Sequence, residues 1–178
     1  MKILDLGCGT RKYKPKPNSR DIVIGVDINK NSLADIIHDL DNFPYPLEDN
    51  EFDLVYASHI LESIENPEEF LKEVYRVLNK NGRVIIKVPH FSSATAIGFL
   101  EHKHYFNLAA FTDLPFGNYF KLKKIRLNYC VYREKWYRKV VNGVLSFFAN
   151  INVRFCERLW CYWVGGFSEI EAEMMKKL

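Results

Sequence analysis

The sequence predicts an α/β fold with a mostly parallel, twisted sheet and helices on both faces. An antiparallel C-terminal edge strand and a helical insertion before the last strand complete the prediction. Runs rich in valine and isoleucine alternate with a helical segment, as they do in βαβ units. The first run ends in a glycine turn. Near the C-terminus, two strand-like runs lack an ordinary crossover helix, which favours antiparallel pairing at a sheet edge.

Five apolar runs in the first half of the chain are expected to be strands: residues 3–6, 22–26, 34–38, 52–57 and 83–88. The clearest helix lies between the last two runs. Asn66 is expected to cap it, Pro67 fits its first position, and Glu69 completes a capping box. Apolar side chains then recur at helical spacing until Asn81 and Gly82, which predict the end of the helix.

The second half of the chain is basic and aromatic. Residues 120–131 and 167–175 predict two strands, and residues 134–164 predict a helical insertion between them. The insertion holds all three tryptophans, Trp136, Trp160 and Trp163. In a helix from residue 137 onward, one side carries Val140, Val141, Val144, Leu145 and Phe148. We expect this apolar side to pack onto the sheet, leaving the charges in solvent.

Charge is unevenly distributed along the 178 residues. The net charge of +3 is too small to indicate a nucleic-acid partner by itself. Residues 39–73 contain eleven acids and one base, whereas residues 121–158 contain ten bases and two acids. The basic aromatic stretch is compatible with an apolar ligand pocket or with a patch on a membrane surface. Stacking on a single-stranded nucleic acid is a weaker alternative, because no recognised motif supports it.

Cysteine usage and the N-terminus predict a cytoplasmic protein with reduced thiols. The four cysteines form no CxxC pair, and Met1 and Lys2 lead directly into an apolar strand, so no signal peptide fits. The longest mostly apolar run, residues 140–151, is about half of what a membrane span needs. We therefore expect the cysteines to be packing residues.

The end of the first strand has the features of a nucleotide-type site. Gly7 and Gly9 allow a sharp turn and a close approach of a ligand, and Asp27 closes the second strand, where an acid can accept ribose hydroxyls. A dinucleotide site would need a third glycine where Lys12 stands, and Asp5 would repel a pyrophosphate. A cofactor with a positive charge, an amino group and no phosphate removes both objections. S-adenosylmethionine is such a cofactor.

The sequence resembles the class I S-adenosylmethionine-dependent methyltransferases, more narrowly methyltransferase type 11. The resemblance covers the chain well to about residue 89 and loosely beyond it. It rests on LDLGCGT at 4–10, GVDIN at 25–29, DLDNFPYP at 39–46 and FDLVYASHILESIENPEEFLKEVYRVLNKNGRVIIKVP at 52–89. It implies a Rossmann-like fold in a single methyltransferase domain, residues 1–178. Residues 1–89 would form the cofactor-binding half and residues 90–178 the acceptor-side half.

The resemblance also implies a set of cofactor-binding residues: Asp5, Gly7, Cys8, Gly9, Asp27, Ile28, Asp39, Leu40, Ala57 and Ser58. The glycine turn would cradle the methionine part, and Asp27 would bind the ribose. Asp39 would meet the adenine amino group, and the backbone of Leu40 the adjacent ring nitrogen. Ala57 and Ser58 would lie beside the transferable methyl group.

Two histidines follow strands at the predicted ligand edge, His59 after the fourth strand and His90 after the fifth. They are our catalytic candidates, as a base or a hydrogen-bond donor for the acceptor. The pair His102 and His104 lacks a third ligand, so we expect no metal site. Family members often have histidine where this chain has Ser63.

The expected activity is methyl transfer to a small-molecule or lipid-like acceptor, leaving S-adenosylhomocysteine. Alternatives are a module that binds S-adenosylmethionine without turnover, and a methyltransferase acting on protein or nucleic acid. Relatives usually begin with a helix before the first strand, which this sequence does not show. One flank of the sheet is therefore less covered unless residues 134–164 or a second subunit pack there. We leave membrane-surface contact through residues 134–164 and a homodimer open, and expect no nucleic-acid partner.

Overall fold

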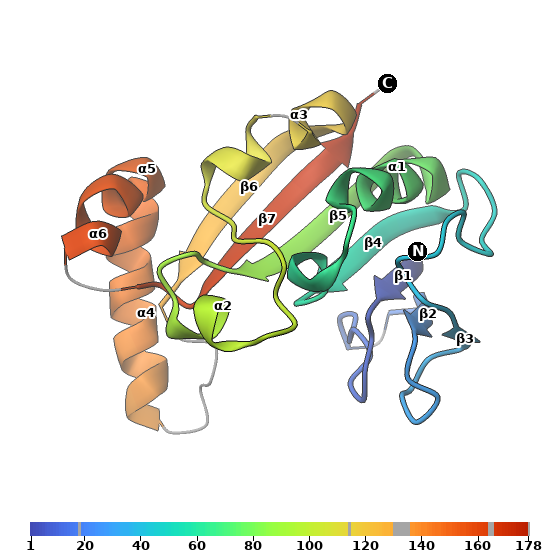
Figure 1. Ribbon diagram of the computed structural model, residues 1–178, viewed down its shortest axis with the longest axis horizontal. Helices are drawn as coiled ribbons and strands as arrows, with labels where there is room; N and C mark the ends of the chain where they lie inside the picture. The colour runs from blue at the N-terminus through green and yellow to red at the C-terminus, as the bar shows by residue number, and fades with distance from the viewer. Residues whose placement is uncertain (18, 114, 130–135, 164–165, 178) are drawn as a thin grey trace.

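The computed structural model describes residues 1–17, 19–113, 115–129, 136–163 and 166–177, and these form a seven-stranded sheet (Figure 1). The strand order is β3-β2-β1-β4-β5-β7-β6. The strands are β1 Lys2–Leu6, β2 Ile22–Asp27, β3 Ile36–Ile37, β4 Phe52–Ser58, β5 Leu78–Pro89, β6 Phe120–Asn128 and β7 Glu169–Lys176. Strands β1 to β5 are parallel, and β7 is antiparallel to both of its neighbours. The predicted α/β fold, with an antiparallel pair near one edge, is confirmed.

The last strand lies inside the sheet, so the expectation of a C-terminal edge strand was wrong in this detail. Strand β7 pairs with β5 on one side and with β6 on the other, and β6 forms the edge. Ile170, for example, stands opposite both Val88 and Leu127. Alternating apolar and polar residues in a sequence predict which face of a strand is buried, but they do not predict which strands lie on either side of it.

Helix α1 (Pro67–Val77) forms as predicted. The Asn66 side chain accepts a hydrogen bond from the Glu69 backbone N–H at 3.3 Å, which confirms the predicted N-cap. The helix ends at Val77 rather than at the predicted stop at residues 81–82, which belong to β5. Its apolar side chains are fully buried, so α1 supplies much of the core between the helices and the sheet.

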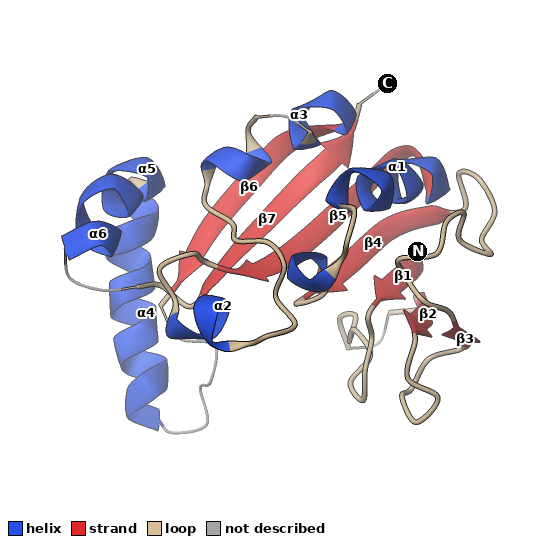
Figure 2. Cartoon of the chain, in the orientation of Figure 1, coloured by secondary structure: helices blue, strands red, loops and turns tan. Residues whose placement is uncertain are grey.

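The remaining helices are short, apart from one. They are η1 Leu61–Ser63, α2 Ala94–Gly98, η2 Ala109–Phe111, α3 Phe116–Tyr119, α4 Trp136–Ile151, α5 Val153–Phe155, η3 Cys156–Trp160 and α6 Cys161–Trp163. Figure 2 shows α1, α2 and α3 on the near side of the sheet and α4 beside β6. None of the helices in the described part of the chain is long and apolar enough to cross a membrane.

The face of the sheet opposite to α1 carries charged side chains on strands β5 and β7. Arg83 pairs with Glu173 at 3.0 Å, and Lys87 pairs with Glu171 at 2.9 Å. Helices were expected on this face too, but the described residues between β1 and β4 contain none. Paired charges replace an apolar surface that a helix would have to cover.

Candidate active site

The glycine turn after β1 joins the ends of two strands. Gly7 and Gly9 both have left-handed backbone angles, with φ of +71° and +52°. The Gly7 N–H donates to the Val26 carbonyl at 2.9 Å, and the Gly9 N–H donates to Asp27 Oδ2 at 2.8 Å. The left-handed region favours glycine, which explains both glycines in this turn.

Asp27, at the end of β2, can still accept hydrogen bonds from a ligand. Its Oδ1 accepts the Asn29 N–H at 2.8 Å, and its Oδ2 accepts the Gly9 N–H. A carboxylate can accept about four hydrogen bonds, so two backbone donors leave lone pairs for hydroxyl groups. Space is present as well, since no atom lies within 4 Å of the point where a Cβ on Gly9 would stand. The turn therefore forms an open cradle beside an acceptor of hydrogen bonds.

Asp5 is a buried carboxyl group beneath this cradle. It is 2% exposed, and its Oδ2 accepts the Tyr13 N–H at 2.6 Å. Burial raises the pKa of Asp5 to about 6, against the smaller lowering effect of that hydrogen bond. Burial likewise raises the pKa of the Cys8 thiol to about 11, so the thiol is neutral at physiological pH. A cationic group bound near Asp5 would offset the cost of its buried charge.

The segment that follows β3 is held by helix α1. The Tyr45 hydroxyl donates to the Leu40 carbonyl at 2.9 Å, next to Asp39. Glu73 of α1 accepts the Tyr45 N–H at 2.7 Å, and Arg76 donates to the Tyr45 carbonyl at 3.1 Å. The loop predicted to meet an adenine ring is therefore fixed from the core side.

The end of β4 lies against the glycine turn. A Cβ on Gly7 would come within 3.0 Å of the Ile60 side chain. Ala57 is fully buried, Ser58 is half-buried, and the next residue, His59, has a left-handed φ of +55°. The predicted cofactor residues thus follow or end strands β1, β2, β3 and β4, whose carboxyl ends share one edge of the sheet.

His59 lies between two buried carboxylates. Its Nε2 is 3.1 Å from Glu169 Oε2, and its Nδ1 is 3.4 Å from Glu62 Oε1. Burial alone would lower the pKa of His59, but the two carboxylates outweigh burial and raise it to about 9. Burial would raise the pKa of Glu169, yet His59 and Lys87 hold it below its usual value. His59 is therefore protonated at neutral pH, as a donor of hydrogen bonds.

A cavity of about 340 Å³ opens beside His59. It lies among the end of β5, the start of β7 and the loop after β5, and its walls include Glu62, Ser63, Phe99 and His102. Glu62 is 1% exposed, and neither of its carboxylate oxygens has a hydrogen-bond partner. His102 Nε2 is 3.9 Å from Glu62 Oε1, too far for a hydrogen bond.

Sequence reasoning missed Glu62 and Glu169 as neighbours of His59. An acid three residues after a histidine in a tight turn was a weak signal for Glu62. For Glu169, 110 residues from His59 along the chain, the pairing of Pro89 with Glu169 in the sheet supplies the contact. No single motif contains that information.

His90 is placed differently from His59. It is fully buried; its Nδ1 lies 2.6 Å from Ser92 Oγ and its Nε2 lies 3.1 Å from Glu157 Oε1. It is not part of the wall of the 340 Å³ cavity. Nor do the described residues contain a group of three or more His, Cys, Asp or Glu side chains arranged to hold a metal ion.

The whole fold is similar to solved S-adenosylmethionine-dependent methyltransferases. One is from Archaeoglobus fulgidus, with a TM-score of 0.62 and 18% identity over 99% of this chain and 86% of that one. Another is phosphoethanolamine N-methyltransferase 2 of Haemonchus contortus, solved with S-adenosyl-L-methionine. It has a TM-score of 0.61 and 14% identity over 99% of this chain and 49% of that one. The fold is thus that of the class I methyltransferases.

Sequence comparison finds a matching family model and three curated relatives. Residues 4–86, a little under half of the chain, match the family described as methyltransferase domain, in line with the fold shared with the solved S-adenosylmethionine-dependent methyltransferases. An uncharacterised protein of Methanocaldococcus jannaschii is 33% identical over 93 residues, 48% of this chain and 43% of that protein. The chain covers less than half the length of the curated relatives it matches.

Proposed function

We propose that this chain transfers the methyl group of S-adenosylmethionine to a small-molecule or lipid-like acceptor held in the cavity beside His59. The observation that supports this most is the convergence of two sites at one sheet edge. The glycine turn, Asp27 and Asp39 lie at one part of the edge, and a separate cavity opens beside His59, the residue after Ser58.

The residues present fit the cofactor. The open side of Gly9 leaves room for the methionine part, and the buried Asp5 carboxylate suits its ammonium group. Asp27 has lone pairs for the ribose hydroxyls, and Asp39 with the backbone of Leu40 would meet the adenine. When bound, the cofactor supplies a methyl group on a sulfonium. The methyl passes to a nucleophilic atom of the acceptor, and the sulfur keeps the electron pair of the broken bond, leaving S-adenosylhomocysteine.

The protein's contribution to this reaction is mainly positioning. Holding two reactants in line is worth about 7–11 kcal/mol of the barrier. Of the two catalytic candidates, we retain His59 as a positive charge beside the acceptor, since its two ring nitrogens face Glu62 and Glu169, and assign His90 to holding Glu157 in place. Where the acceptor must lose a proton, the buried carboxylate of Glu62, which faces His59 at 3.4 Å and accepts no hydrogen bond from the described residues, is the base within the cavity. We assign the reaction to the cytoplasm, since the three described cysteines are free thiols.

Calorimetry with S-adenosylhomocysteine tests the cofactor assignment. Asp27→Ala removes a charged hydrogen-bonding group worth about 1.5–3 kcal/mol, so affinity should fall about ten- to a hundredfold. Glu68→Ala, which removes an exposed acid from α1, is the control and should bind normally. If Asp27→Ala is folded and binds as tightly as the parent, the assignment is wrong.

Turnover is tested separately from binding. Transfer of labelled methyl from S-adenosylmethionine to components of a cell extract distinguishes an enzyme from the alternative, a module that only binds the cofactor. Glu62→Gln should lower transfer while leaving the affinity for S-adenosylhomocysteine unchanged. Binding without any transfer to lipids, small molecules, protein or nucleic acid would favour the module.

A further inference from the structure

Helix α4 presents its polar side to the protein and its apolar side to the outside. Asn142, Ser146 and Asn150 follow one another at intervals of four residues, so they form one stripe. Asn150 donates to the Leu127 carbonyl at 2.9 Å and accepts the Leu127 N–H at 3.1 Å. Ser146 Oγ accepts the Tyr129 N–H at 3.0 Å. These side chains hydrogen-bond the backbone at the end of β6, at Leu127 and Tyr129, so the prediction that the apolar side of α4 packs onto the sheet was wrong.

The outward side of α4 carries large apolar side chains in water. Phe147 is 66% exposed, Phe148 64% and Ile151 69%, and Trp163 of α6 is 84% exposed. Monomeric soluble proteins rarely expose a contiguous apolar surface of this kind. The arrangement therefore indicates that something apolar covers residues 136–163, which we call the helical insertion.

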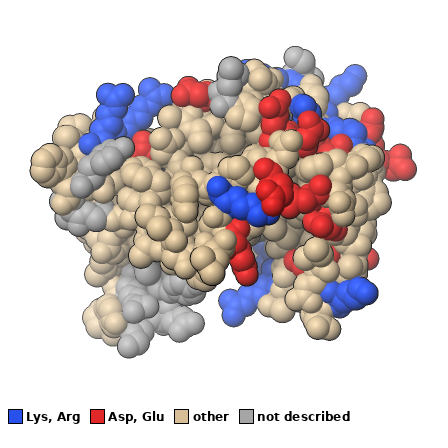
Figure 3. All heavy atoms as spheres, viewed as in Figure 1, with Lys and Arg blue, Asp and Glu red and all other residues tan. Residues whose placement is uncertain are grey.

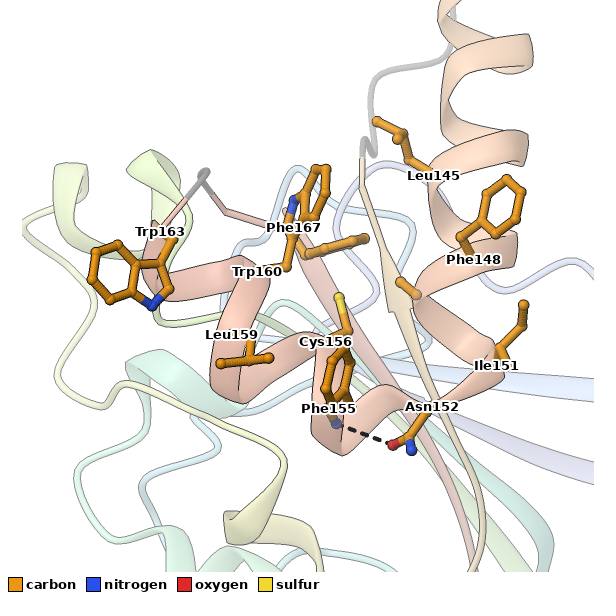
Figure 4. A pocket seen from close by; sticks show the side chains of 11 residues that line it. Leu145, Phe148, Ile151, Asn152, Phe155, Cys156, Leu159, Trp160, Trp163 and Phe167 are labelled. Atoms are coloured by element: carbon orange, nitrogen blue, oxygen red, sulfur yellow. Dashed lines mark hydrogen bonds between the residues drawn. The ribbon is translucent and has the colours of Figure 1, made fainter.

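The apolar surface continues into a groove. Figure 4 shows α4 on one side and α5, η3 and α6 on the other, with Leu145 directed into the space between them and Trp163 directed away from it. The groove has a volume of about 570 Å³, and its walls include Leu145, Phe148, Phe155, Leu159 and Trp160. Among the described residues of the walls, the single amide side chain, Asn152, accepts the Phe155 N–H at 3.0 Å. The groove thus offers an apolar ligand an almost wholly apolar surface.

The exposed charged residues described within the insertion are basic. The insertion contains a single acid, Glu157, and that carboxylate is turned inward, where it accepts the Leu108 N–H at 2.7 Å and contacts His90. Lys139, Arg154 and Arg158 are exposed, and none forms an ion pair with another described residue. Figure 3 shows a largely uncharged surface over the insertion with basic side chains at its upper rim, and acids gathered on the side of α1.

We infer that the helical insertion docks onto an anionic lipid bilayer, with its apolar face among the acyl chains and its basic residues at the headgroups. A helix with exposed aromatic residues and lysine or arginine at its margins binds at this depth. The cytoplasmic leaflet carries the negative charge that such a rim attracts. A second copy of the chain is a poorer occupant, because a twofold contact would bring the same cations together.

This inference deepens the proposed function and rests on it only for the acceptor. Glu157 of the insertion contacts His90 in the loop after β5, and the same loop supplies Phe99 and His102 to the wall of the acceptor cavity. Binding to lipid is measured without any methyl transfer, so the two proposals fail independently.

Sedimentation with phosphatidylcholine vesicles, with and without phosphatidylserine, tests the inference. The parent chain should bind the vesicles that contain phosphatidylserine, and binding should weaken as salt is raised. Phe147→Ser with Ile151→Ser should reduce binding on the order of tenfold or more. The matched control is Ile22→Ser, an equally exposed apolar residue on β2, and should change nothing.

Charge-reversal variants test whether the basic residues of the insertion contribute to vesicle binding. Arg154→Glu with Arg158→Glu should reduce binding on the order of tenfold or more. Lys16→Glu with Lys80→Glu, the same charge change outside the insertion, should have a smaller effect. Thermal melts and the affinity for S-adenosylhomocysteine show that each variant is folded. Absence of binding to anionic vesicles overturns the inference, as does a dimer by analytical ultracentrifugation that Phe147→Ser with Ile151→Ser dissociates.

Discussion

Helices α1 and α4 are both amphipathic, and they use their two sides in opposite ways. In α1 the apolar side is buried against the sheet, and polar residues on its flank, Glu73 and Arg76, reach the loop after β3. In α4 the polar stripe contacts the sheet edge, and the apolar side is exposed. The comparison teaches that an amphipathic pattern in the sequence predicts an apolar side and a polar side of a helix, but does not predict which side faces the core. That choice depends on what each helix meets, a buried sheet face for α1 and a free strand edge for α4.

The largest expected effect is a difference in the free energy of unfolding between a Phe→Ala substitution in α1 and one in α4. Phe70→Ala, in α1, leaves a cavity at a fully buried site and should lower the free energy of unfolding by about 3–5 kcal/mol. Phe148→Ala, in α4, removes an exposed side chain and should change it by about 0.5 kcal/mol or less. Urea unfolding of both variants measures this. Similar losses would mean that the outward side of α4 is packed in solution.

The polar stripe of α4 should matter more for stability than its apolar side. Asn150→Ala leaves the N–H and C=O of Leu127 without partners, which costs about 1–3 kcal/mol. Asn66→Ala, which removes the cap of α1, should cost about 1 kcal/mol. Chemical denaturation ranks the two variants. A neutral Asn150→Ala would show that α4 does not hold the edge of β6.

The smallest expected effect is the pH dependence of stability that comes from the ion pair between His59 and Glu169, which joins the two halves of the chain. The pKa of His59 is raised from 6.5 to about 9, so the charged form is favoured in the folded state. Its stabilising contribution is complete below pH 6.5 and is lost as the pH rises through about 9. The loss should be modest because the His59 side chain is partly exposed and solvent screens the pair.

His59→Gln isolates this contribution. Thermal melts of the parent should show a decline in stability between pH 6.5 and 9 that the variant lacks. Lys80→Gln, which removes an exposed cation elsewhere, should retain the decline. An identical pH dependence in the parent and in His59→Gln would show that His59 is not held by Glu62 and Glu169.

The parts of the site that depend on local sequence could be predicted. The turn at Gly7 and Gly9 and the cap at Asn66 are set by residues within a few positions of one another, and both formed as expected. The carboxylates around His59 could not be predicted, because Glu169 reaches it only through the pairing of β7 with β5. The cofactor and catalytic roles remain predictions, which the binding and transfer experiments address.

Strand β7 is synthesised after every other described strand, yet it pairs on both sides within the sheet. Until residues 169–176 have left the ribosome, β5 and β6 both lack a neighbour, and the nascent chain carries two open strand edges. The insertion, with its apolar face, is made before the sheet can close. Long-range pairing of this kind is slow to form. The eight residues of β7 therefore join β6 to the parallel strands, while Glu157 separately ties the insertion to the segment after β5.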